Sequence, residues 1–412
     1  MASLLLHPEC NLRFSNRMEH HEKISTALLL MATSIGASYA QGEYPAPGRL
    51  EGTTAFFHEA EGPQKANKSY PAWYRGNAPD GLADKNSLYH YVDLIGPKSF
   101  VTKGHNNEHI YMGTLELAPG ETYPAHSHPA SEIYYVISGE AQWFVDDQSQ
   151  TVVPGEMIYH RSLAAHGWRN LSKDKPLRVA WIWWPEGDNS VLAKGARFTN
   201  PDLFNSRDKV QPFAVPLPKV RMDASDNING KYGEYPVPGR LVGTTAFVHE
   251  SATPKKATKT HPAWFRGTGE NGIADENAKY FYHELIGPNL PKPAFQNSYL
   301  YFGSLEQKSG YTYPAHNHPA PEFYFVISGE AEWYVDDEKQ KVKPGTIIYH
   351  RPYAVHGWKT TSKEPLRMLW AWWVEEDPSV LNVSAKMVNP DLAKDEKTAL
   401  PYASPIPPVR IK

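Results

Sequence analysis

A long internal repeat constrains the fold of this chain more than any other feature of the sequence. Residues 120–139, GETYPAHSHPASEIYYVISG, return as residues 310–329, GYTYPAHNHPAPEFYFVISG, about 190 residues further along. Flanking segments recur at nearly the same distance, for example PAW at 71–73 and again at 262–264. A repeat of that length corresponds to a whole domain and not to one unit of a solenoid. The sequence therefore predicts two tandem domains with the same fold.

The repeat and the composition around it divide the chain into four parts. We expect a secretory signal at residues 1–40, a first domain at 41–222, a linker at 223–233 and a second domain at 234–412. The linker sequence, DASDNINGKYG, is rich in the small polar residues that form loops. A chain of 412 residues, of which 41% are hydrophobic, is long enough to fill two cores.

The first part of the chain is typical of a cleavable export signal. Basic residues precede an apolar run at 24–37, and small residues follow it just before Gln41. Because the run is too short to span a bilayer, we expect a secreted or periplasmic protein, translated from Met1 or from Met18. The single cysteine, Cys10, lies before the cleavage point, so the mature chain would contain no disulfide.

The composition favours an all-β fold. The chain contains 36 proline, 29 glycine, 24 tyrosine and 12 tryptophan residues, which is typical of short strands joined by turns. Residues 140–146, EAQWFVD, alternate in polarity and end in an acidic turn, as a β-hairpin does. Many short strands at turn spacing predict a β-sandwich or barrel.

The charge pattern indicates which partners to expect. The formal net charge is −3 and the basic residues are scattered, whereas nucleic acids and anionic membranes require clustered basic surface. We therefore expect a small-molecule substrate, no nucleic acid and no membrane span in the mature protein. The sequence also leaves room for a homodimer.

The repeated stretch carries residues that suit a metal ion. His126 and His128 are two residues apart and share one face of a strand, and a bend after them would bring Glu132 close. Two imidazoles and a carboxylate suit a divalent transition metal, and a third imidazole would complete four ligands. We expect His166 to be that ligand, with His160 as the competing residue.

The second copy repeats this set of residues. Its ligands would be His316, His318, Glu322 and His356, with His350 as the competitor. These ligand types accept iron, manganese, zinc, nickel or cobalt, so we expect one divalent transition metal per domain and leave its identity open.

The same residues resemble the first cupin motif. The spacing Gly, five residues, His-x-His, three residues, Glu, six residues, Gly occurs in both copies. The second cupin motif is looser: Gly155, His166 and Asn170 are correctly spaced, but Arg161 and Leu163 replace its usual proline and glycine. The second copy departs from the motif at Arg351, Tyr353 and Thr360. The resemblance implies two tandem cupin barrels, that is, double-stranded β-helix or jelly-roll domains, each with a metal site.

A finer resemblance is to the cupin-type dimethylsulfoniopropionate lyases. It covers PAH at 124–126, EIY at 132–134, His166 and a Pro-Leu-x-x-x-Trp-x-Trp strand at 176–183, and the second copy repeats it. The resemblance implies a metal-dependent lyase that cleaves this zwitterion, or a similar sulfonium or betaine carboxylate, to dimethyl sulfide and acrylate. It also implies that the tyrosine two residues after the glutamate serves as the base or as a metal ligand. The corresponding phenols are Tyr134 and Tyr324, with Tyr123 and Tyr313 as second phenols in each pocket.

The residue types fit this reaction independently of the resemblance. A β-elimination needs a base beside a Cα proton, and a phenol near a dication has its anionic form favoured. A sulfonium group has no hydrogen-bond donor, and aromatic faces are its natural host. Trp181 and Trp183 share a strand face, as do Trp370 and Trp372. Trp143, Trp168, Trp333 and Trp358 are candidates for further walls, but for any single one of these tryptophans we favour a place in the barrel core.

Two other functions remain open at this stage. The first is a metal-dependent bicupin dioxygenase or decarboxylase acting on a small carboxylate, because Glu-x-Tyr also occurs in cupins that are not lyases. The absence of an Arg-Glu-x-His-x-His run weighs against the oxalate-acting type. The second is a non-catalytic small-molecule-binding bicupin, which the two intact ligand sets disfavour.

Overall fold

The computed structural model of the chain describes residues 52–97, 105–218 and 245–408. By internal contacts the chain divides into Met1–Ala46 and Pro47–Lys412, and all described residues belong to the second unit. The predicted signal and the predicted linker both lie outside the described residues.

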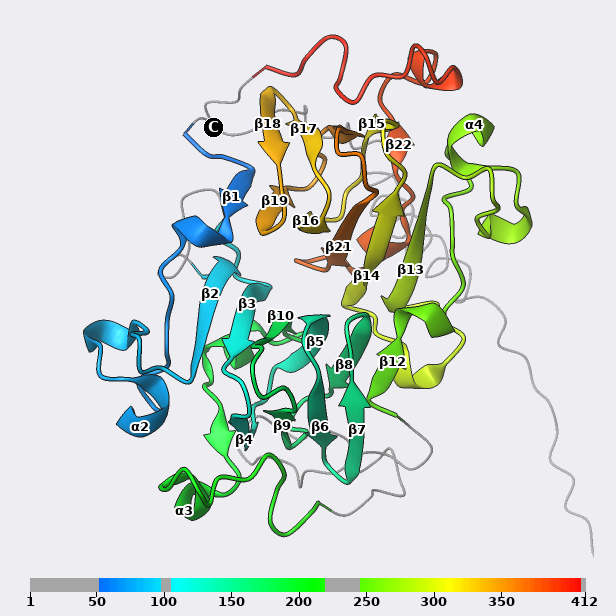
Figure 1. Cartoon of the computed structure of the whole chain (residues 1–412). Helices are drawn as coiled ribbons and strands as arrows, with labels where there is room; N and C mark the ends of the chain where they lie inside the picture. The colour runs from blue at the N-terminus through cyan, green and yellow to red at the C-terminus, as the bar shows by residue number, and fades with distance from the viewer. Residues whose placement is uncertain (1–51, 98–104, 219–244, 409–412) are drawn as a thin grey trace, which may run out of the picture. The chain divides into compact units, whose positions relative to one another are not determined.

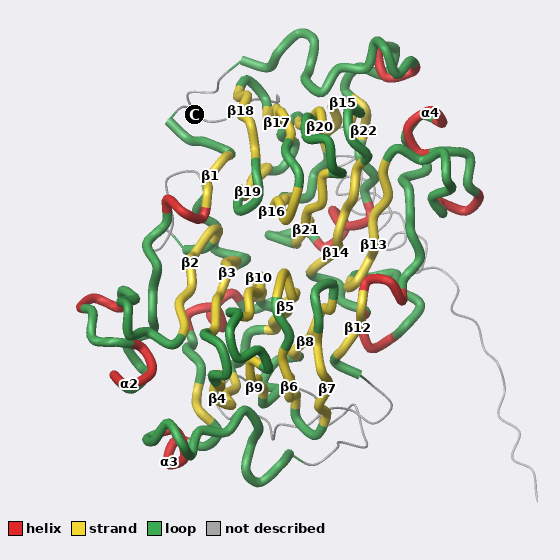
Figure 2. The backbone as a smooth tube through the Cα atoms, in the orientation of Figure 1, coloured by secondary structure: helices red, strands yellow, loops and turns green. Residues whose placement is uncertain are grey.

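The described residues form an all-β structure with four antiparallel sheets (Figure 2). The two sheets built around the first copy of the repeat have the strand orders β12-β8-β5-β10-β3-β2 and β11-β4-β9-β6-β7. Their strands are β2 (Tyr89–Ile95), β3 (Tyr111–Leu117), β4 (Thr122–Ser127), β5 (Ser131–Ser138), β6 (Ala141–Val145), β7 (Gln148–Val152), β8 (Glu156–His160), β9 (His166–Asn170), β10 (Leu177–Trp184), β11 (Arg197–Phe198) and β12 (Phe247–His249).

The two sheets around the second copy repeat this arrangement. Their strand orders are β1-β19-β16-β21-β14-β13 and β18-β17-β20-β15-β22. Their strands are β1 (Phe56–His58), β13 (Tyr280–Ile286), β14 (Leu300–Gln307), β15 (Thr312–Asn317), β16 (Glu322–Ser328), β17 (Ala331–Val335), β18 (Glu338–Val342), β19 (Thr346–His350), β20 (His356–Thr360), β21 (Leu366–Trp373) and β22 (Lys386–Met387).

Helices in the described residues are short, and all but η8 lie between strands along the chain. The α-helices are α2 (Ala72–Arg75), α3 (Pro201–Phe204) and α4 (Ala263–Arg266). The 3₁₀ helices are η1 (Glu59–Glu61), η2 (Pro79–Gly81), η3 (Asn189–Ala193), η4 (Glu250–Ala252), η5 (Glu270–Gly272), η6 (Pro293–Phe295), η7 (Pro378–Asn382) and η8 (Leu392–Lys394).

The predicted hairpin at 140–146 is confirmed as the pair β6 and β7. Along β6 the residues Ala141, Trp143 and Val145 are buried, and the residues between them are partly exposed, as one-sided packing requires. Asp146 begins the turn with a φ of 51°. Aspartate tolerates this left-handed conformation better than most residues, so the acidic turn fixes the register of the hairpin.

The two copies exchange a strand, which the sequence analysis did not predict. β1 comes from the first copy but pairs with β19 of the second, with Phe56 opposite Ile348. β12 comes from the second copy and pairs with β8 of the first, with Phe247 opposite Ile158 (Figure 1). Phe57 of β1 and Val248 of β12 are buried in one core that contains residues of both barrels. Each six-stranded sheet therefore needs both copies to be complete.

One histidine lies beside this common core with no hydrogen bond of ordinary geometry to its ring within the described part of the chain. His105 is fully buried, with its ring 5.9 Å from that of Phe57 and 6.1 Å from that of Tyr349. Neither ring nitrogen makes a hydrogen bond of ordinary geometry to a described residue. The matching position in the second copy is Phe295, since the backbone carbonyls of both residues accept from equivalent glycine N–H groups. Burial lowers the pKa of His105 to about 4.

We expect the substitution His105→Phe to stabilise the protein by about 1–3 kcal/mol, because it removes an unsatisfied buried polar group. The gain should increase as pH falls from about 6.5 towards 4, since the unfolded imidazole takes up a proton near pH 6.5 and the folded one does not. Chemical denaturation at pH 8 and at pH 5 measures both effects. An unchanged free energy of unfolding at both pH values would show that His105 has a partner.

Candidate metal centres and substrate pocket

Three strands bring the four predicted ligands of the first barrel together. β4 pairs with β9 so that His126 lies opposite His166, and β5 carries Glu132 near its first residue. His128 lies in the bend between β4 and β5. The ligand atoms of His126, His128, Glu132 and His166 all lie within 4.8 Å of one another, and all four side chains are buried.

The second barrel forms the same cluster. The ligand atoms of His316, His318, Glu322 and His356 also lie within 4.8 Å of one another and are buried. Each barrel therefore contains one buried His/His/Glu/His metal-binding cluster, as the repeat predicted.

Backbone carbonyls orient the imidazoles. The Nδ1 atoms lie 2.9 Å from backbone oxygens in three pairs: His126 with Pro124, His128 with Ala130 and His166 with Ala164. This contact fixes the tautomer of each ring and turns Nε2 toward the centre of the cluster. The Nε2 atom of His166 is 3.1 Å from Glu132 Oε2 but makes no hydrogen bond. A buried nitrogen without a hydrogen bond, aimed at a buried carboxylate, fits a metal ligand.

The electrostatics of the cluster favour the protonation states that a metal requires. Burial, reinforced by the neighbouring His166, holds the pKa of His126 well below its usual value. Burial alone would raise the pKa of Glu132, but His128 and the other imidazoles hold it well below its usual range. Neutral imidazoles and an ionised carboxylate are the forms that bind a divalent cation.

His160, the competing candidate for the fourth ligand, is not one of the four clustered residues but contacts two of them, Glu132 and His166. Its Nε2 accepts a hydrogen bond of 3.0 Å from the indole of Trp143, and its Nδ1 lies 3.3 Å from Glu132 Oε2. Its ring stacks on His166 at 3.8 Å. His350 is held in the same way, with Trp333 as the donor. Because one nitrogen is already engaged, His160 positions His166 and Glu132.

The departures from the second cupin motif leave its turn intact. Leu163 and Tyr353 stand where glycine is usual and adopt positive φ values of 66° and 64°. Their N–H groups donate to the carbonyls of His128 and His318 at 2.8 and 2.9 Å. A left-handed conformation costs a residue with a side chain about 1–2 kcal/mol. The fold therefore keeps this strained turn, which ties the segment before His166 to that of His128.

The predicted catalytic tyrosines lie beside the clusters. Tyr134 packs against Trp143, His160 and Trp168 with ring distances of 5.0, 5.5 and 4.8 Å. Tyr324 has the equivalent neighbours in the second barrel. Burial and the charge of the adjacent glutamate raise the pKa of both phenols well above the ordinary value. A phenolate at either position therefore requires a nearby positive charge.

The second predicted phenols also pack against the core. Tyr123 stacks on Trp168 at 4.1 Å, and Tyr313 stacks on Trp358 at the same distance. Both are buried, and Tyr313 lines the cavity described below.

The tryptophans divide into two groups. Trp143 and Trp168 are fully buried and stack at 4.0 Å behind Tyr134, so they form core and not pocket wall, and Trp333 and Trp358 do the same. Trp183 instead lies across from Glu132, donates its indole N–H to that carboxylate and stacks on His128 at 4.2 Å. The sequence analysis missed this contact to the ligands.

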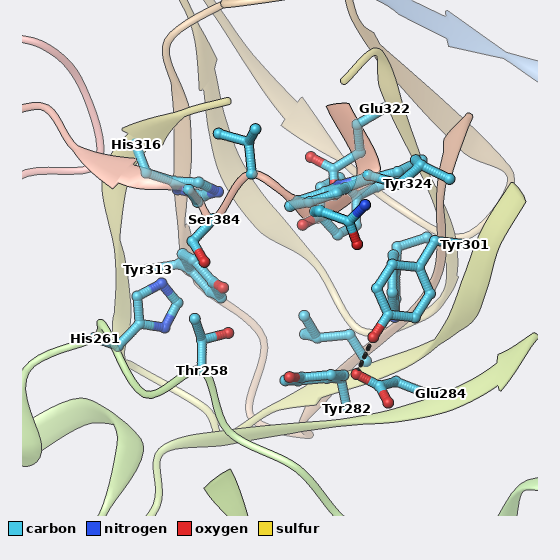
Figure 3. Close-up of a pocket in the computed structure, with 17 residues that line it drawn as sticks. Thr258, His261, Tyr282, Glu284, Tyr301, Tyr313, His316, Glu322, Tyr324 and Ser384 are labelled. Carbon is cyan, nitrogen blue, oxygen red and sulfur yellow. Dashed lines mark hydrogen bonds between the residues drawn. The ribbon is translucent and has the colours of Figure 1, made fainter. Parts of the chain in front are cut away.

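A cavity of about 210 Å³ opens beside the cluster of the second barrel (Figure 3). One side of it is polar and is formed by Thr258, His261, Tyr313, His316 and Ser384. Aromatic side chains line much of the rest of it, among them Tyr282, Tyr301, Trp370 and Trp372, and Glu284 accepts a hydrogen bond from Tyr301. The sequence analysis missed His261 and Glu284, although comparing the two copies position by position would have drawn attention to them.

The cupin domain family matches residues 113–183 and 305–372, which contain both clusters. The chain is a bicupin. A solved oxalate decarboxylase of Lactobacillus farciminis has a TM-score of 0.51, with 13% identity over 84% of this bicupin and 92% of that chain. An oxalate decarboxylase of Bacillus subtilis has a TM-score of 0.50, with 14% identity over 85% and 84% of the two chains. Identity this low establishes the shared fold alone.

Three curated relatives resemble parts of the bicupin. Dimethylsulfoniopropionate lyase DddQ of Ruegeria pomeroyi is 34% identical over 16% of this chain, and the putative lyase DddL of Cereibacter sphaeroides is 32% identical over 26%. A gentisate 1,2-dioxygenase of Haloferax is 25% identical over 60%. The chain covers 33%, 41% and 66% of the lengths of these relatives, respectively. All three names are those of enzymes, and with the two clusters they indicate a metal-dependent enzyme.

Within the described ranges, no helix combines the length and the apolar character needed to cross a membrane.

Proposed function

We propose that this bicupin is a metal-dependent lyase that cleaves dimethylsulfoniopropionate, or a similar small sulfonium or betaine carboxylate, to dimethyl sulfide and acrylate. The observation that carries the proposal is the cavity of the second barrel, which joins a metal-binding cluster, a tyrosine and an aromatic wall. The likeness to the two lyases DddQ and DddL supports it.

The cavity can accommodate the two ends of a zwitterion. A divalent ion held by His316, His318, Glu322 and His356 would act as a Lewis acid toward the substrate carboxylate and so acidify the Cα proton. Trp370 packs with Tyr282 and Tyr301 in the aromatic wall, which suits a cation without hydrogen-bond donors, whereas Trp372 stacks on His318 beside the cluster. Glu284 adds negative charge at that end, although Lys256 pairs with it and reduces its effect.

The proposed base is the phenol two residues after the glutamate, Tyr324 or Tyr134. As the phenolate it takes the Cα proton and becomes the neutral phenol, the electrons of the C–H bond form the Cα–Cβ double bond, and the Cβ–S bond breaks with its electron pair leaving on sulfur. The products are acrylate and neutral dimethyl sulfide, so atoms and charges balance. Tyr313 and Tyr123 lie beside the base and would orient the substrate.

The test is the release of dimethyl sulfide into the headspace. Purified protein loaded with a divalent metal, given dimethylsulfoniopropionate, should release dimethyl sulfide and acrylate in equal amounts. The release should proceed equally well without oxygen, because elimination needs no oxidant. Protein with a full metal content that releases no sulfide would refute the proposal.

A dioxygenase is the second candidate function. The gentisate 1,2-dioxygenase of Haloferax matches a larger share of this chain than either lyase does. Oxygen consumption with a small aromatic or aliphatic carboxylate, and its loss under strict anaerobiosis, would favour this function over the lyase. A decarboxylase would instead release carbon dioxide, and a non-catalytic binding protein would return every substrate unchanged.

Export and self-association are further proposals. We propose that the signal at residues 1–40 is removed and that the mature protein acts outside the cytoplasm, since a substrate taken up from the surroundings would be met there first. Mass spectrometry of the mature N-terminus should find Gln41. Size-exclusion chromatography with light scattering tests the homodimer.

A further inference from the structure

The two barrels share their metal clusters but differ in what surrounds them. Tyr70 and His261 each precede the repeated PAW segment and therefore occupy matching positions. Phe198 pairs with His126 in the first barrel, and Met387 pairs with His316 in the second. Phe204 at the end of α3 corresponds to Ala393 in η8. Three aromatic residues of the first barrel are thus replaced by smaller or more polar residues in the second.

In the first barrel, Tyr70, Phe198 and Phe204 form one aromatic cluster. The ring of Tyr70 lies 5.0 Å from Phe198 and 5.5 Å from Phe204, and the two phenylalanine rings are 4.5 Å apart. The hydroxyl of Tyr70 donates to that of Tyr123 at 2.8 Å. Tyr123 is the counterpart of Tyr313, which lines the cavity of the second barrel. Tyr70 thus packs against Tyr123 and forms a hydrogen bond with its hydroxyl, at the position that His261 occupies in the second barrel.

In the second barrel, His261 leaves one nitrogen available to a ligand. It is 3% exposed and lines the cavity together with Thr258, Tyr313 and Ser384 (Figure 3). Its Nδ1 lies 2.5 Å from the hydroxyl of Tyr280, whereas its Nε2 has no hydrogen-bond partner among the described residues. A buried, unpartnered nitrogen at the wall of a cavity is costly unless a ligand or water satisfies it.

The hydrogen bonds of Tyr280 indicate which nitrogen of His261 carries the proton. The phenol oxygen accepts from the backbone N–H of Thr258 at 2.7 Å. The phenol can donate its own O–H to His261 Nδ1, and in that tautomer the ring proton lies on Nε2. An N–H at this position, on the polar side of the cavity and next to Tyr313, matches an anionic oxygen of the ligand.

We infer that His261 determines the specificity of the second barrel by donating a hydrogen bond from Nε2 to the carboxylate of the substrate. The second barrel then binds the carboxylate more tightly than the first, where Tyr70 stands in place of His261 and its hydroxyl is bonded to that of Tyr123. The identity of the substrate rests on the proposed function. The preference of the second barrel for a small carboxylate does not.

The test exchanges the two residues between the barrels and uses binding as its main measurement. His261→Tyr installs the residue of the first barrel, and Tyr70→His is the reciprocal variant. Protein loaded with cobalt(II) is titrated with acrylate, and the visible d–d bands report carboxylate binding at the metal. We expect two metal ions per chain in every variant, and an acrylate affinity that falls roughly 10- to 100-fold in H261Y, because a hydrogen bond to a charged group is lost.

Conservative variants separate a specific hydrogen bond from a general packing effect. His261→Gln keeps a side-chain N–H and should retain most of the acrylate affinity. His261→Leu should lose as much acrylate affinity as H261Y does. If H261Y does not fold, the comparison of H261Q with H261L takes its place. Acrylate binding by H261L as tight as in the wild type, or no acrylate binding by the wild type, would overturn the inference. If the wild type releases no dimethyl sulfide but its acrylate affinity depends on His261, the proposed lyase function fails and the inference stands.

Discussion

Replacing His128 and His318 together with alanine is expected to remove the metal from both barrels and with it all activity. Each imidazole supplies one of four ligands, and its Nε2 lies 3.0 Å from the ligand glutamate. Losing a residue that merely supports a ligand lowers metal affinity by about 10- to 100-fold, so losing a ligand should cost more. Elemental analysis should find two ions per chain in the wild type, one in each single variant and none in the double variant.

The control for this experiment is His90→Ala, which removes an imidazole outside both clusters. His90 is partly exposed and lies near Glu116, so its loss should change neither the metal content nor the activity. The single variants also show whether the barrels contribute equally. Metal retained at two ions per chain in the double variant would contradict the assignment of the clusters.

The metal clusters could be predicted because most of their geometry is local. His126, His128 and Glu132 lie within seven residues, so strand periodicity and one bend are sufficient to bring them together. His166 comes from a separate strand, and it was separated from His160 only by its position in the sequence and by the family spacing. The structure supplies the physical reason for the difference, which is that the indole of Trp143 already engages the Nε2 of His160.

The strand exchange could not be predicted because it depends on pairing between distant segments. β1 and β12 are three residues long, and so short a strand carries little periodicity of its own. The sequences of β1 (FFH) and β12 (FVH) do not specify which of the two barrels each strand joins. The role of Trp183 was hidden for a similar reason: its strand face was readable, but its position opposite Glu132 depends on the register between β10 and β5.

Replacing Tyr134 and Tyr324 together with phenylalanine is expected to lower the rate of dimethyl sulfide release by about 10²- to 10⁴-fold, the usual contribution of a general base. The metal content should stay at two ions per chain, because each cluster keeps its three histidines and its glutamate. The rings should also keep their places, since each is packed against two tryptophans that a phenylalanine contacts equally well.

Tyr135→Phe is the matched control, because Tyr135 is adjacent on β5 but points to the opposite face. Its hydroxyl donates to Glu250 at 2.6 Å in the contact between the two copies, so its loss should affect stability and leave the rate unchanged.

Tyr123→Phe combined with Tyr313→Phe should raise KM more than it lowers kcat, if these phenols orient the substrate and do not take its proton. Full activity in the Tyr134→Phe and Tyr324→Phe double variant, with metal present, would remove tyrosine as the base. The proton would then have to be taken by another group in the cavity.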